Sequence, residues 1–115
     1  MDYEQKKREA LNPNTPPEIL ETLATDEEWL IRSLVAENPN TPPETLQLLA
    51  TDKDLVVLHW VAQNPNTLQE TLQLLATNED YWVRCGVLDN PNKTQIIERL
   101  VLMTEYQLST QPQNP

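Results

Sequence analysis

The feature that most constrains this chain is an internal repeat with a period of 26 residues. An Asn-Pro-Asn segment recurs at that spacing, at residues 12–14, 38–40, 64–66 and 90–92. A second segment, Leu-Ala-Thr followed by Asp or Asn, recurs at residues 23–26, 49–52 and 75–78. Matches at two separate places in each copy indicate a repeat architecture, in which neighbouring units stack to bury one continuous core.

Each unit carries two helix start signals. Thr15 lies three residues before Glu18, and Thr25 lies three residues before Glu28, which is the spacing of a capping box; both pairs recur in the next two units. In the first unit they predict a helix A over residues 16–24 and a helix B over residues 26–36. The Asn-Pro turn then ends helix B, because proline disfavours the α region for the residue before it.

Such short helices need packing, because isolated helices below about 12–15 residues are marginal in water. Helix A has a leucine and alanine stripe with i, i+3, i+4 spacing, beginning with Leu20, Leu23 and Ala24. Helix B has two β-branched columns, which we expect in the core: Ile31, Val57, Val83, and Val35, Val61, Val87.

These patterns predict an all-α fold, an α-solenoid of three two-helix repeats with a capping helix at each end. We place the caps at residues 1–11 and 90–106 and the repeats at 12–37, 38–63 and 64–89, which makes one domain over 1–106. The last helix, from Gln95 to Tyr106, matches the core stripe of the repeats only if the turn before it has lost one residue. Residues 107–115 contain almost nothing apolar, so we expect a disordered tail.

Composition narrows the classes of function. Eighteen acidic against eight basic residues give a net charge of −10, which would repel a phosphate backbone and argues against nucleic acid. The chain has no apolar run near the roughly 20 residues that span a bilayer and no secretion signal at its start, so we expect a cytoplasmic protein without a membrane partner. A single cysteine, Cys85, allows no internal disulfide and no metal cluster, so we expect no cofactor.

Residues 35–52 read Val-Ala-x-Asn-Pro-x-Thr-Pro-Pro-Glu-x-Leu-x-x-Leu-Ala-x-Asp. This motif resembles the leucine-rich repeat variant family, and the resemblance extends over about residues 10–103. It implies a right-handed superhelix of paired short helices, one of them 3₁₀-like in the family's founding structure; the longer unit here favours an α-helical helix B. Ile31-Arg32 and Val83-Arg84 match the family's helix B, whereas Val57-Leu58 departs from it. The founding structure also carries a cysteine-ligated iron–sulfur cluster, but no residue here matches its ligands.

Trp29, Leu55 and Tyr81 form a helix B column that lies roughly 160° from the Ile31 column, at about 100° per residue. Two interpretations are open, and the first is a row of anchors for a protein or peptide partner. The alternative is that helix B needs a wide apolar arc between neighbouring units. Trp60 and Trp82 are assigned to packing. The other candidate partner-binding residues are Arg32, Leu58, Arg84 and His59.

Ser33, His59 and Cys85 form another column, in which His59 and Cys85 suggest a base and a nucleophile. A tolerant, partly exposed position would look the same, and no orienting acid is identifiable. We therefore expect a protein-interaction or scaffold module without catalytic activity, and an enzyme using Cys85 and His59 is the alternative. With only three units, thinly covered end faces also favour association between copies of the chain.

Overall fold

The computed structural model describes residues 1–111, and every regular element within them is an α-helix. The helices are α1 (Tyr3–Leu11), α2 (Pro17–Leu23), α3 (Trp29–Glu37), α4 (Pro43–Leu49), α5 (Leu55–Gln63), α6 (Gln69–Ala76), α7 (Tyr81–Leu88) and α8 (Gln95–Thr110). The three pairs α2/α3, α4/α5 and α6/α7 each supply one helix A and one helix B. The prediction of an all-α repeat solenoid is confirmed, and all three B helices are α-helical rather than 3₁₀.

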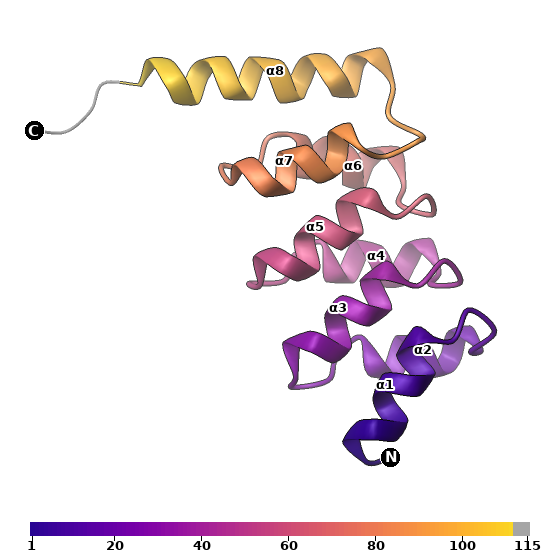
Figure 1. Cartoon of the computed structure of the whole chain (residues 1–115). Coiled ribbons are helices and arrows are strands. Elements are labelled where there is room, and N and C mark those ends of the chain that lie inside the picture. The colour runs from indigo at the N-terminus through magenta and orange to yellow at the C-terminus, as the bar shows by residue number, and fades with distance from the viewer. Residues whose placement is uncertain (112–115) are drawn as a thin grey trace, which may run out of the picture.

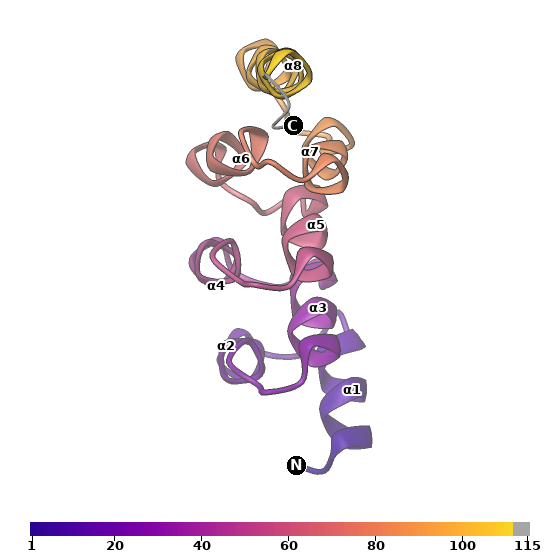
Figure 2. The same ribbon diagram turned by 90° about the vertical axis from the view of Figure 1, so that its left-hand side faces the viewer.

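The helices stand in two parallel columns (Figure 2). The A helices α2, α4 and α6 form one column, and the B helices α3, α5 and α7 form the other, with α1 below them. Each helix of the B column packs directly on its neighbour, and α8 lies on both α6 and α7 at the far end of the stack (Figure 1). The molecule is therefore elongated, with principal extents of 49 × 34 × 17 Å.

The core follows the two predicted patterns. Leu20, Leu46 and Leu72 of the A helices and both β-branched columns of the B helices are fully buried. They join one continuous apolar cluster that runs from Ala10 of α1 to Val101 of α8. Because each short helix buries its apolar side against the neighbouring units, stability comes from stacking rather than from single helices.

A ladder of asparagine side chains joins the units. In Asn38, Asn64 and Asn90 the amide Nδ2 donates to two backbone carbonyls of the preceding unit, at 2.7 to 3.0 Å. The side-chain oxygen of each accepts from the backbone N–H two residues later and so shapes the turn. The ladder therefore explains why the turn opens with asparagine, a role that the sequence pattern did not predict.

The predicted capping boxes of the A helices are wrong. The hydroxyls of Thr15, Thr41 and Thr67 donate backwards at 2.6 Å, to the carbonyls of Glu9, Val35 and Val61. The A helices have no side-chain cap. The reason is burial: these threonines are almost fully buried, and each acceptor carbonyl lies four residues before a proline, which has no N–H to donate to it.

The second set of boxes is also wrong, and the B helices begin three residues later than predicted. Thr25, Thr51 and Thr77 donate to the carbonyl three residues earlier, which closes helix A. The next residue in each unit, Asp26, Asp52 or Asn78, then accepts from the backbone N–H two residues later and forms a turn. This turn occupies the positions that the prediction gave to helix B.

The last helix differs from the prediction in three ways. It begins in repeat register, because Gln95 follows Gln69 by the full period, so no residue is lost from the turn before it. Its buried side is rotated instead: Ile97, Val101 and Thr104 are buried, whereas Glu98, in the place of Leu72, is exposed. Helix α8 lies across both α6 and α7. It also continues to Thr110, so residues 107–110 are helical rather than part of a tail. Of the predicted tail, residues 112–115 lie outside the described part of the chain.

Candidate partner-binding face

The B helices present a set of exposed and half-buried apolar side chains outside the fully buried core. We call it the B-helix face and define it by eight residues: Trp29, Leu30, Leu34, Leu55, Val56, Trp60, Tyr81 and Trp82. Four of them are substantially exposed, Trp29 at 46%, Leu55 at 44%, Tyr81 at 66% and Trp82 at 43%, and the other four are half-buried. The question that the sequence left open is thereby settled, because the Trp29, Leu55 and Tyr81 column is exposed rather than enclosed between units.

Local structure aligns this face along the stack. Trp29, Leu55 and Tyr81 are each the first residue of their B helix. The side chains of Asp54 and Asp80 accept the free N–H groups of the first turns of α5 and α7, which places both helix starts at the same point of the unit. Tyr3, one period before Trp29 and also the first residue of its helix, extends the column onto α1 with 41% exposure. The sequence reasoning missed Tyr3, although the spacing could have found it.

An aromatic cluster occupies the middle of the face. The His59 ring stacks on Trp82, with centroids 3.9 Å apart and an interplanar angle of 12°, and meets Trp60 edge-on. Its Nδ1 donates to the Trp82 carbonyl at 2.9 Å, since that oxygen can only accept. Gly86 permits this close approach, because a Cβ there would lie 2.8 Å from the His59 carbonyl. The nearest atoms to that position all belong to α5: the carbonyl oxygen and Nδ1 of His59 and the Cβ of Ala62.

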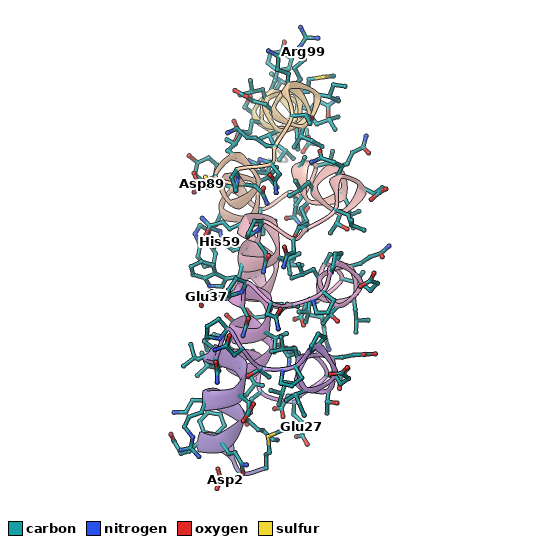
Figure 3. All side chains as sticks on the ribbon, turned by 90° about the vertical axis from the view of Figure 1, so that its right-hand side faces the viewer. Asp2, Glu27, Glu37, His59, Asp89 and Arg99 are labelled. Carbon is teal, nitrogen blue, oxygen red and sulfur yellow. The ribbon has the colours of Figure 1, made fainter. Side chains whose placement is uncertain are left out.

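Carboxylates border the face on both sides. Glu28, Asp54 and Asp80 immediately precede the B helices, and Glu37 and Asp89 lie at their other ends. Figure 3 shows Glu37, His59 and Asp89 along the B-helix side of the stack. An apolar surface of aromatic anchors with acidic edges is suited to a complementary partner rather than to bulk water.

Three of the other predicted partner-binding residues form a different column, together with Lys6 of α1. Lys6 pairs with Asp26 at 2.6 Å, and Arg32 pairs with Asp52 through Nε at 2.7 Å, so each cation reaches the following unit. One period later, Leu58 stands in the place of Arg32 and Asn78 in the place of Asp52. This unit therefore lacks both the positive and the negative charge of the pair. Arg84 has a weaker partner, because its Nε lies 3.6 Å from Glu105 of α8.

This column therefore corrects part of the predicted site. Leu58 and Arg84 are buried, and the guanidinium of Arg32 is held by Asp52 and by two backbone carbonyls. The Asp52 hydrogen bond raises the pKa of Arg32 above its usual value. We infer that these residues join units to one another, because they have little surface to offer a partner.

The column of Ser33, His59 and Cys85 lies on the stacked B helices, and its members differ in exposure. Ser33 and His59 are buried, Cys85 is half-buried, and Nδ1 of His59 is engaged by Trp82 rather than by the thiol. Cys85 interacts instead with Tyr81 on its own helix, and this interaction is the main reason why the pKa of the Tyr81 hydroxyl is raised. His59 belongs to the predicted partner-binding set, but with 6% exposure it supports the face from beneath.

Within residues 1–111, no group of three or more His, Cys, Asp or Glu side chains is arranged to hold a metal ion. No helix in this part of the chain combines the length and apolar character that crossing a bilayer requires.

The stacked pairs of short helices and the Asn-Pro turns define a helical repeat protein. Residues 4–58, just under half of the chain, match the model of the Leucine Rich Repeat Variant domain, which is the family that the motif indicated. The third unit, beyond the match, replaces Thr-Pro-Pro by Thr-Leu-Gln but keeps the asparagine ladder. No curated protein and no solved structure gave a significant match to the chain.

Proposed function

We propose that this chain is a protein-interaction module, and that its B-helix face binds a partner segment with apolar side chains flanked by lysine or arginine. The observation that carries the proposal is the alignment of large exposed apolar residues on three successive B helices. Tryptophan and tyrosine dominate the binding energy of protein interfaces, and all three tryptophans of the chain belong to this face.

The charge of the partner follows from the edges of the face. Carboxylates stand on both sides of the apolar strip, and the whole chain carries a net charge of −10. Basic residues beside the apolar anchors of a partner would lie against these carboxylates, which speeds association and disfavours acidic competitors. The repeat form supports an extended partner, because equivalent positions on successive units present similar groups at regular intervals.

Peptide selection tests this proposal, because a random library offers the face apolar, basic and acidic segments in competition. A phage-displayed library of random peptides would be selected on the immobilised chain, and we expect enriched peptides to combine Trp, Leu or Phe with Lys or Arg. Trp29→Ala and Trp82→Ala should each weaken their binding by about tenfold or more, the loss typical of an interface anchor.

The matched control is Leu74→Ala, which removes an equally exposed apolar side chain, 56% accessible, from α6 of the A column. We expect this variant to keep full binding. Selection of acidic peptides, or equal losses in Leu74→Ala and Trp29→Ala, would contradict the proposal.

A catalytic role for Cys85 and His59 is the alternative that the sequence raised. No observation favours it, because the two side chains are engaged with different neighbours.

A further inference from the structure

The free end of the stack has a second apolar surface, which lies on α8 and is separate from the B-helix face. We call it the α8 outer face and define it by Ile96, Arg99, Leu102, Met103 and Tyr106. The four apolar side chains are exposed at 69%, 54%, 58% and 70% in chain order. Leu102, Met103 and Tyr106 also line a shallow surface hollow of ≈ 420 Å³. In Figure 3, Arg99 points away from the rest of the stack.

This surface is unusual for the end of a solenoid. Terminal units generally present a polar outer face, because nothing stacks on them. The cap at the other end follows that rule, since α1 contains Glu4, Lys6, Lys7 and Arg8. Helix α8 does the opposite, because its inner side is buried on α6 and α7 while its outer side remains apolar. The helix has 16 residues, about twice the length of the others, and it reaches past α7 (Figure 1).

We propose that the α8 outer face binds the same face of a second copy of this chain, with the two α8 helices antiparallel. Charge is the first argument for this occupant. The chain has 18 acidic residues, so two copies repel one another over most of their surface. The five residues of the α8 outer face include no acid and one arginine, and the exposed Glu98 at its edge lies beside Arg99 and Leu102. Two copies therefore repel one another less here than over most of their surface.

The order of residues along α8 is the second argument. In an antiparallel pair of identical helices, residues equally far from the midpoint face one another, so every contact occurs twice. With the midpoint between Leu102 and Met103, each Leu102 meets the partner copy's Met103. Arg99 and Tyr106 are then also equally far from the midpoint. Each guanidinium therefore lies over a tyrosine ring of the other copy, a favourable cation–π arrangement for a cation at an apolar contact.

The size of the contact sets the expected strength. Covering these side chains on both copies removes on the order of 1,000 Å² from water, which is at the low end for specific interfaces. We therefore expect a reversible dimer in the micromolar range. Helix α8 also lies at the end of the stack, so the dimer leaves both B-helix faces uncovered.

Sedimentation equilibrium of the full chain tests this proposal, over concentrations from about 1 μM to about 300 μM, which bracket a micromolar dissociation constant. We expect the native chain to change from monomer to dimer and Met103→Glu to stay monomeric. Leu74→Glu is the matched control, because it adds the same charge at an equally exposed apolar position of α6. Both variants should keep the circular-dichroism spectrum and melting midpoint of the native chain, because both side chains are exposed to water in the monomer.

A charge exchange tests the antiparallel register. Arg99→Glu alone should weaken the dimer at least tenfold. Adding Tyr106→Arg to it should restore most of the affinity, because the two new charges would then face each other between copies. The proposal is overturned if the native chain stays monomeric throughout, if Met103→Glu still dimerises, if Leu74→Glu abolishes the dimer equally, or if the double variant shows no recovery.

Discussion

At the scale of single residues, the first asparagine of each Asn-Pro turn has two roles at once. Asn64 accepts a backbone N–H of its own turn through Oδ1 and donates to the carbonyls of Ala36 and Asn38 through Nδ2. These carbonyls belong to the preceding unit, where stacking removes them from water. A buried carbonyl without a donor is costly, so one side chain fixes the turn and also satisfies the end of the neighbouring helix.

The ladder predicts a large difference between two identical substitutions. Asn64→Ala should lower the free energy of unfolding by about 2–4 kcal/mol, because it removes three hydrogen bonds and leaves the buried carbonyl of Ala36 without a donor. Asn12→Ala should lower the free energy of unfolding by less than about 1 kcal/mol. Asn12 is exposed, follows the first helix, and makes only the hydrogen bond within its own turn. Urea unfolding of both variants measures the difference, and equal losses would show that the ladder contributes no stability.

Gly86 illustrates how a single missing Cβ sets the distance between two helices. In most helices alanine is favoured over glycine by about 1 kcal/mol, so Gly86→Ala would ordinarily stabilise α7. Here the new Cβ would lie 2.8 Å from the His59 carbonyl and 2.9 Å from the Cβ of Ala62, and neither atom belongs to a flexible side-chain end.

We expect Gly86→Ala to destabilise the chain by a net of about 1–2 kcal/mol, because overpacking outweighs helix propensity. The stacking of His59 on Trp82 should loosen at the same time, which tryptophan fluorescence would report. Cys85→Ala, at the adjacent half-buried position, is the control and should change stability less. A more stable Gly86→Ala variant would indicate that α5 and α7 can separate without loss.

At the scale of elements, charged pairs join successive helix pairs and also attach the N-terminal cap. The pKa of Asp26 is lowered, chiefly by its hydrogen bond with Lys6 and further by the backbone N–H of Glu28. The pKa of Lys6 is raised by the same contact. A carboxyl with a lowered folded-state pKa stabilises the fold above its unfolded-state pKa, and this stability is lost as pH falls through the folded-state value.

This sign predicts how Asp26→Asn behaves with pH. At pH 7 the variant should have a lower urea midpoint than the native chain, because Lys6 loses its partner. Below the lowered folded-state pKa of Asp26, where this carboxyl also becomes protonated in the native chain, the two midpoints should converge. Glu37→Gln, at an exposed position, is the control for a general change in net charge. A difference that stays constant with pH would contradict the assignment.

At the scale of the whole molecule, the two proposed contacts respond to salt in opposite directions. The B-helix face is expected to attract a basic partner, whereas the α8 outer face brings together two copies that each carry a net charge of −10. Dissolved ions screen attraction and repulsion alike, with a screening length of about 10 Å at 0.1 M.

Raising NaCl from about 50 mM to about 500 mM should therefore weaken the binding of selected basic peptides and strengthen the dimer. Peptide titration calorimetry and sedimentation equilibrium measure the two effects on the same preparation. The Leu74→Ala variant should follow the native chain in both measurements. A dimer that weakens with salt would indicate that attraction between charges holds the copies together, contrary to the proposed apolar contact.

The sequence by itself determined the repeat period, the two helices in each unit and the core columns, because apolar periodicity and Asn-Pro turns act within one unit and its immediate neighbours. It also identified the Trp29, Leu55 and Tyr81 column, but not whether that column was exposed. Only the tertiary structure decided which groups form hydrogen bonds between units. Asn64 bonds to a carbonyl about one period earlier, and Arg32 pairs with Asp52 of the next unit. The buried threonines bond across the Asn-Pro turn. Those partners are set by how units stack. The local capping motif therefore predicted the helices correctly but their hydrogen bonds wrongly.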